Sequence, residues 1–302
     1  MALYVFDGTG NEDRDGDDRD SNACKFFHAY EDPNHPDKND DPDQRLGSLY
    51  LKGIGRRART FVGRTFSEAF GIGGHQRVRQ AMERLENNIE HGDTTVDIAG
   101  FSRGAALALS FANEIASKMK GVTVRFIGVF DVVGEFGLPG EHVNAGHNLH
   151  LPPNVKNVYH AMALDETRAA FQLTRLGGTG HAEDDRLQEV WFRGVHSDVG
   201  GGNNNPSLNG IALNWLFQNA KRCGLPIKES DVLANLAAIK TPPLISIHKV
   251  DASIERHIRD TDVLHSSVII GEGQDGRRHV NPKKELSRID DLGSIIKPEA
   301  HA

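Results

Sequence analysis

Residues 95–109, TVDIAGFSRGAALAL, contain the pattern that decides the fold. The first five residues predict a buried strand, and the apolar spacing from Ala105 onward predicts a helix. Between them stands a serine, Ser102, with Gly100 and Gly104 on either side. Glycine lets neighbouring elements approach a turn this sharp, and such a turn holds a strained serine that faces outward at a helix amino end. The alternative is a glycine-bounded loop with an incidental serine.

Strands and helices alternate on both sides of this turn. Strands are expected at 3–6, 122–130 and 190–192, and helices at 78–89, from 105 to 119 and at 208–222. Alternation of this kind predicts an α/β fold with a mostly parallel sheet covered on both faces. Weaker patterns predict partial strand at 155–164, helix at 165–173 and 230–239, strand at 244–248, an apolar run at 263–270 and irregular chain from 271.

No linker divides the chain, so residues 1–302 are expected to form a single catalytic domain. Residues 12–60 are expected to be a long polar insertion, because 12–48 are dominated by Asp, Asn, Pro and Gly and should bury little. Residues 225–302 are expected to form a C-terminal cap or extension.

Charge is unevenly distributed around a net value of −7. From Asp7 to Asp43 there are thirteen acidic and four basic residues, whereas 45–79 hold eight basic residues and one acidic. The basic stretch is either a solvated face or a surface for transient contact with anionic membrane. A chain that is acidic overall is a poor nucleic-acid binder, so no nucleic-acid partner is expected. Partner proteins stay open.

Metal and disulfide chemistry are not expected. Cys24 and Cys223 lie far apart without a metal-type spacing, so both are expected to be reduced bystanders. Five aspartates alternate around Gly16 as in calcium loops, but the closing glutamate is absent because position 24 is cysteine. The N-terminus lacks a signal-peptide pattern, so we expect a cytoplasmic location in the producing cell and, for any export, a route without a signal peptide.

A nucleophilic serine needs a base and a carboxylate that orients it, and both are found near predicted strand ends. His196 follows the strand at 190–192 in a glycine-rich loop, a typical position for catalytic residues in α/β folds. Asp131 ends an apolar strand, where an unpaired carboxylate is costly. The order Ser102, Asp131, His196 is that of α/β-hydrolases. Capping is the alternative role for Asp131, and surface duty that for His196.

Further side chains are expected to support this site. The oxyanion donors are expected to be the N–H of Arg103 and an N–H from the Gly8-Thr9 turn. Asp7 is expected to organise that turn. Asp198 stands too close to His196 in sequence to reach its ring, so it is expected to bind backbone in the His196 loop.

Six motifs in order resemble a known family. They are 6–11 (FDGTGN), Tyr50 with 53–55 (GIG), 100–105 (GFSRGA), 129–134 (VFDVVG), 163–168 (ALDETR) and 191–202 (WFRGVHSDVGGG). They resemble the α/β-hydrolase family that contains the type VI secretion phospholipase effectors, over roughly residues 3–216. The resemblance implies an α/β-hydrolase-like fold and a triad of Ser102, Asp131 and His196. It also implies ester hydrolysis of glycerophospholipids without a cofactor.

Three functions therefore stand open from the sequence. The first is a phospholipase-type serine hydrolase working through an acyl-enzyme. The second is a soluble carboxylesterase or thioesterase for small esters. The third is a catalytically silent binding module on the same fold.

Overall fold

The computed structural model describes residues 1–14, 19–32, 46–54, 66–134, 150–177, 184–239, 255–268 and 286–296, and for 66–72 only the backbone. Its helices are α1 (Asn22–Ala29), α2 (Phe66–Glu90), α3 (Ser102–Lys118), α4 (His196–Gly200), α5 (Pro206–Arg222) and α6 (Glu229–Ala238), with a 3₁₀ turn, η2, at Ala169–Phe171. Its strands are β1 (Ala2–Phe6), β2 (Leu49–Leu51), β3 (Thr95–Phe101), β4 (Thr123–Phe130), β5 (Val158–Ala163), β6 (Leu187–Phe192), β7 (Val263–His265), β8 (Arg288–Ile289) and β9 (Ile295–Ile296).

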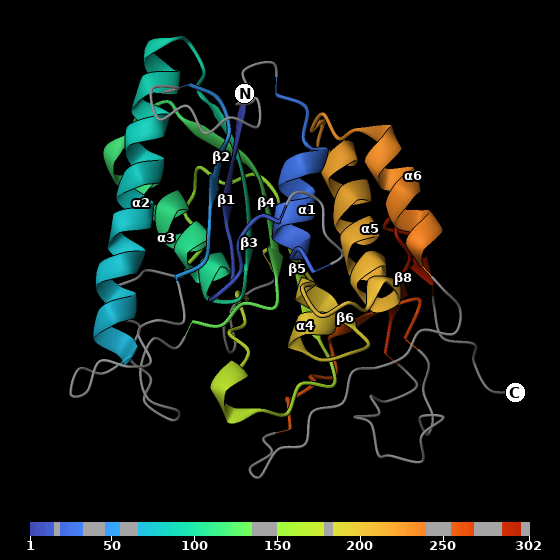
Figure 1. Cartoon of the computed structure of the whole chain (residues 1–302). Coiled ribbons are helices and arrows are strands. Elements are labelled where there is room, and N and C mark those ends of the chain that lie inside the picture. The colour runs from blue at the N-terminus through green and yellow to red at the C-terminus, as the bar shows by residue number, and fades with distance from the viewer. Residues whose placement is uncertain are drawn as a thin grey trace, which may run out of the picture.

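The strands form one sheet in the order β2-β1-β3-β4-β5-β6-β7-β8-β9. Every neighbouring pair is parallel except β8 and β9, which are antiparallel. Helices α2 and α3 cover one face, while α1, α5 and α6 lie on the other (Figure 1). The predicted α/β fold with a mostly parallel, helix-flanked sheet is confirmed.

The core has a layer on each side of the sheet because the central strands are apolar on both faces. β1 and most of β3 and β4 are buried throughout, as expected for parallel strands between helices. On one side the strands pack against apolar residues of α2 and α3. On the other side they pack against aromatic residues of α1 and α5. No described helix is long and apolar enough to cross a membrane.

The sheet has a switch point between β1 and β3. From β1 the chain passes through α1 on one face to the edge strand β2, and it returns through α2 on the opposite face to β3. In open α/β sheets, the crevice at the carboxyl ends of the strands beside such a point is where ligands bind. The turns after β1 and β3 both open there.

The polar insertion buries more than its composition predicts. Within 19–32, α1 is capped by Ser21, whose hydroxyl accepts the N–H of Cys24, and the helix buries Phe26 and Phe27. Residues 49–51 form β2 at the sheet edge. The expectation of little burial is therefore wrong here, because a few apolar residues at helix and strand spacing are enough to dock a polar segment. Residues 15–18 and 33–45 lie outside the described residues.

Two other expectations also need correction. Residues 165–173 form only the 3₁₀ turn η2, because the N–H of Asp165 donates to the Gly194 carbonyl and that of Arg168 to the Glu166 carboxylate. The chain after 271 is not wholly irregular. β8 and β9 extend the sheet, and Asp290 accepts the N–H groups of Leu292 and Ser294 in the turn between them. The described part of 225–302 thus adds strands β7, β8 and β9 at one edge of the sheet. The predicted strand at 244–248 lies outside the described residues.

Candidate active site

Ser102 lies at the sharp turn between β3 and α3, in the left-handed backbone region with φ 58°. The glycines around it allow this turn. A Cβ on Gly100 would stand 2.7 Å from the Cα of Ala105, and one on Gly104 would stand 2.3 Å from the carbonyl oxygen of Phe6. The close approach expected from the sequence is therefore a contact between backbones, and it places Ser102 beside the end of β1.

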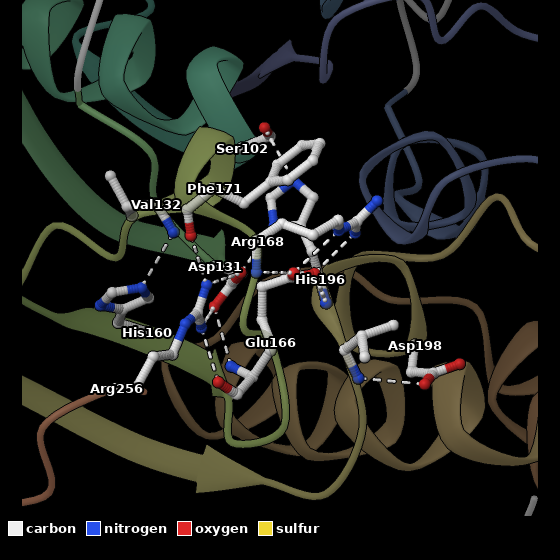
Figure 2. A network of polar contacts seen from close by, with 12 residues as sticks. Ser102, Asp131, Val132, His160, Glu166, Arg168, Phe171, His196, Asp198 and Arg256 are labelled. Carbon is white, nitrogen blue, oxygen red and sulfur yellow. Dashed lines mark hydrogen bonds and ion pairs between the residues drawn. The ribbon is translucent and has the colours of Figure 1, made fainter. Parts of the chain in front are cut away.

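Ser102, His196 and Asp131 lie in one chain of hydrogen bonds. Ser102 Oγ is 2.9 Å from His196 Nε2, and His196 Nδ1 is 2.6 Å from Asp131 Oδ2. All three side chains are buried. Asp131 follows β4 and His196 begins α4 after β6, so three strand ends supply the three groups (Figure 2). This arrangement suits proton transfer from a serine hydroxyl to a neutral imidazole.

The imidazole of His196 packs against two aromatic rings. The ring centroid of Phe101 lies 4.7 Å away and that of Phe171 lies 4.6 Å away. Its backbone N–H donates to Glu166 Oε2 at 3.1 Å. Burial lowers the pKa of His196 below its ordinary 6.5, against the opposing effect of Asp131. The ring is thus held in place and favoured in its neutral form.

Asp131 is fully buried and surrounded by donors. Its Oδ1 accepts the N–H of Ala163 at 2.8 Å, and the guanidinium of Arg256 contacts both carboxylate oxygens at 2.5 and 2.9 Å. Burial by itself would raise the pKa of Asp131, but Arg256 and His196 outweigh burial and hold that pKa well below its usual range. The carboxylate is therefore ionised and fixed, as an orienting group must be.

The turn after β1 has a different donor arrangement from the one expected. The N–H of Gly8 donates to Asp7 Oδ1 at 2.6 Å, so it is engaged within its own turn. Thr9 Oγ1 is buried and has no hydrogen-bond partner among the described residues. Arg103 contributes a first-turn N–H at the amino end of α3, where the helix dipole is positive. Burial lowers the pKa of the Arg103 side chain to about 10.

Asp7 and Asp198 both bind their own loops. Asp7 Oδ2 accepts the hydroxyls of Ser21 at 2.7 Å and Tyr50 at 2.5 Å, which joins the turn after β1 to α1 and β2. Burial raises the pKa of Asp7 despite these hydrogen bonds. Asp198 Oδ2 accepts the N–H of Val195, directly before His196. Neither carboxylate contacts the His196 ring.

Sequence reasoning missed Glu166, Arg168, Phe171 and Arg256. Glu166 and Arg168 stand in a motif already singled out, and their bidentate pair at 2.8 and 2.6 Å supports the His196 backbone. Arg168 also lies over the ring of Phe171, 4.1 Å from its centroid. Arg256 belongs to none of the motifs quoted above, so only the folded structure identifies it.

One group among the described residues offers metal-type ligand atoms. These are on Asp13, Cys24 and His28, all within 4.8 Å of one another. His28 Nε2 and Asp13 Oδ2 are 2.9 Å apart, so an ion pair already accounts for two of the three. None of the three belongs to the hydrogen-bonded set of Ser102, His196 and Asp131.

A comparison with protein-family models identifies the family of this chain. The family model described as type VI secretion system (T6SS) phospholipase effector Tle1-like, catalytic domain, matches residues 3–121 and 111–219. The chain belongs to this family. The match covers every motif quoted above, and it includes Ser102, Asp131 and His196.

A solved structure agrees on the fold, and a second one was also matched. The crystal structure of an uncharacterized protein from Pseudomonas aeruginosa is 21% identical with a TM-score of 0.53, and the match covers 80% of this chain and 47% of that one. The Tle1 effector bound to the VgrG spike is 23% identical with a TM-score of 0.45, covering 68% of this chain and 52% of that one. The chain thus spans about half the length of these structures. The curated proteins include no match.

Proposed function

We propose that this chain is a serine hydrolase that cleaves a carboxylic ester of glycerophospholipids through an acyl-enzyme and releases a fatty acid. The observation that carries the proposal is the hydrogen-bonded chain from Ser102 through His196 to Asp131, with Ser102 at a strained strand-to-helix turn. Membership of the Tle1-like phospholipase family supports the phospholipid as the substrate class.

Ser102, His196 and Asp131 have different roles in the proposed cycle. His196 Nε2 takes the proton of Ser102 as Oγ attacks the ester carbonyl, and His196 then gives that proton to the leaving alcohol. Asp131 keeps Nδ1 protonated and stabilises the imidazolium. Water, activated by the same histidine, then releases the fatty acid and restores Ser102. The acyl-enzyme thus divides one difficult step into two easier ones.

The developing oxyanion is proposed to lie between α3 and the turn after β1. Its donors are the Arg103 N–H and Thr9, through backbone N–H or hydroxyl. The buried Thr9 Oγ1, without a partner among the described residues, supports Thr9 over Gly8. Removal of one such preorganised donor lowers kcat by about 10²- to 10³-fold.

The nucleophile is tested by Ser102→Ala. Loss of the hydroxyl should lower kcat by about 10⁴-fold or more and abolish labelling by a fluorophosphonate probe, because no other group can form the acyl-enzyme. Ser110→Ala is the matched control, since Ser110 is a buried serine of the same helix outside the site and its loss should leave both readouts unchanged. Undiminished hydrolysis by Ser102→Ala would exclude the proposed mechanism.

The substrate class is tested with wild-type protein and Ser102→Ala in parallel. Fatty-acid release from phosphatidylethanolamine and phosphatidylglycerol vesicles is compared with cleavage of short-chain esters and thioesters. Ser102-dependent release from vesicles supports the phospholipase, and cleavage of small esters alone supports the carboxylesterase or thioesterase. If wild-type protein shows neither turnover nor probe labelling, the result supports the catalytically silent binding module.

Membrane contact through 45–79 remains part of the proposal, as does a cytoplasmic location before export. Lys52 and Arg79 are exposed, and Arg77 Nε donates to the Lys52 carbonyl. The other basic residues of this stretch lie outside the described residues. Varying the anionic lipid fraction of the vesicles tests the contact directly, because an electrostatic contact weakens as salt rises.

A further inference from the structure

Arg256 is a buried arginine in contact with the triad carboxylate, although it lies 125 residues beyond it in sequence. Its side chain is only 5% exposed. One guanidinium nitrogen contacts Asp131 Oδ1 and donates to the Ala163 carbonyl at 2.6 Å. The other contacts Asp131 Oδ2 and donates to the Phe171 carbonyl at 2.8 Å (Figure 2). The planar head is therefore fixed from both sides.

These contacts determine how Asp131 faces His196. Each carboxylate oxygen has two donors: Ala163 N–H and Arg256 on Oδ1, and His196 Nδ1 and Arg256 on Oδ2. Rotation of the carboxylate would break several of these bonds at once. The Phe171 carbonyl binds Arg256 while the Phe171 ring packs on His196, so the same guanidinium also anchors a wall of the imidazole site.

Arg256 also changes the charge that His196 experiences. The groups facing the ring are the carboxylates of Asp131 and Glu166 and the guanidinium of Arg256, and Glu166 is itself paired with Arg168. Burial is the largest cause of the lowered pKa of His196, the two carboxylates oppose it, and Arg256 adds to it. A histidine beside a bare buried carboxylate would hold its proton more strongly and lose its function as a base sooner as pH falls.

We propose that Arg256 is a positioning residue that fixes the Asp131 carboxylate and limits the negative charge presented to His196, and so sets the lower pH limit of catalysis. This inference rests on the proposed hydrolase function. A purely structural ion pair would contribute to stability alone. The chain contains a suitable comparison, because Arg125 and Asp97 form another bidentate pair in which Asp97 is fully buried. This pair lies near the amino ends of β3 and β4, whereas Ser102 and Asp131 follow their carboxyl ends.

The test uses two substitutions at each arginine. Arg256→Lys keeps the charge but loses the planar fork, whereas Arg256→Gln loses both. Arg125→Lys and Arg125→Gln are the matched controls. The readouts are kcat and KM on a soluble ester, the acid limb of kcat/KM against pH, and the melting temperature.

We expect Arg256→Lys to lower kcat about tenfold with KM and the acid limb unchanged, because the carboxylate is less well held. Arg256→Gln should lower kcat about 10²-fold. It should also move the acid limb up by about one pH unit, since removing a nearby positive charge makes His196 easier to protonate. The Arg125 variants should lower the melting temperature and leave kcat and the acid limb at wild-type values.

Wild-type kcat in Arg256→Lys, or an unmoved acid limb in folded Arg256→Gln, would overturn the inference. If Arg256→Gln does not fold, the kcat of Arg256→Lys decides. Activity that survives Ser102→Ala is a different failure, because it removes the hydrolase proposal itself.

Discussion

At the scale of single residues, two of the three groups in the site have strained backbone. Ser102 has φ 58° and Asp131 has φ 44°, and among the described residues only Asn204 is another non-glycine with positive φ. Each such residue costs on the order of 1–3 kcal/mol and persists only where the surroundings enforce it. At Ser102 the enforcement comes from packing of α3 against β1 through Gly104.

Gly104→Ala tests that packing. The new Cβ would lie 2.3 Å from the Phe6 carbonyl oxygen and 2.4 Å from that of Asp7, and these backbone atoms cannot move without shifting β1. We expect a loss of stability of about 3 kcal/mol, measured by chemical denaturation, together with reduced kcat. Gly177→Ala is the control, because its Cβ would meet only side-chain atoms at ordinary distances of 3.4 Å or more. Equal stability of the two variants would contradict this account.

Residue types at strand ends were enough to select Ser102, Asp131 and His196 from the sequence. They were not enough to select Arg256, because its segment has no periodicity and its contacts form only when distant parts of the chain meet. Position in the sequence predicts the Gly8 N–H as an oxyanion donor, but in the structure it donates to the neighbouring carboxylate of Asp7. Sequence position thus located the site, and side-chain competition decided which donors face it.

At the scale of elements, the segment 255–262, which precedes β7, is held against the sheet by Asp262. Asp262 Oδ2 accepts from Trp191 Nε1 at 2.8 Å and from the N–H of Arg259 at 2.9 Å, and both its oxygens pair with Arg175. Arg256 lies in the same segment. The attachment therefore also holds the guanidinium beside the triad.

Asp262→Ala should release this segment. It leaves the Trp191 indole N–H without this acceptor, and Arg175 keeps only its ion pair with Glu189 among the described residues, so we expect a loss of about 1–3 kcal/mol and faster proteolysis within 255–262. Asp184→Ala is the control, because Asp184 is about one-third exposed and its ion pair among the described residues is with its near neighbour Arg186, which is worth under about 1 kcal/mol. Identical denaturation midpoints for the two variants would show that the segment is not held through Asp262.

At the scale of the whole molecule, helix α1 of the acidic N-terminal excursion is part of the core. Phe26 of α1 stacks between Phe126 of β4 and Phe217 of α5, with ring centroids 5.9 and 5.7 Å away. Asn22 Nδ2 donates to the carbonyls of Val199 and Asn209. α1 therefore joins the sheet to the elements that carry His196.

Phe26→Ala should destabilise the entire fold. Removing a fully buried ring leaves a cavity, and we expect a loss of about 3–5 kcal/mol by denaturant titration. Leu233→Ala, which truncates a side chain that is 57% exposed, should change stability by no more than about 0.5 kcal/mol. A Phe26→Ala midpoint close to that of Leu233→Ala would mean that the excursion folds independently of the sheet.

Local sequence patterns are enough to predict the fold class, the strand-to-helix turn at Ser102 and the order of the three candidate catalytic residues. These follow from local periodicity and from the rule that parallel strands end at one edge. The burial of α1, the extension of the sheet by β8 and β9, and the ion pair of Arg256 with Asp131 become visible only in the folded chain. The physical reason is that these outcomes depend on contacts between residues far apart in the chain, which no local pattern records.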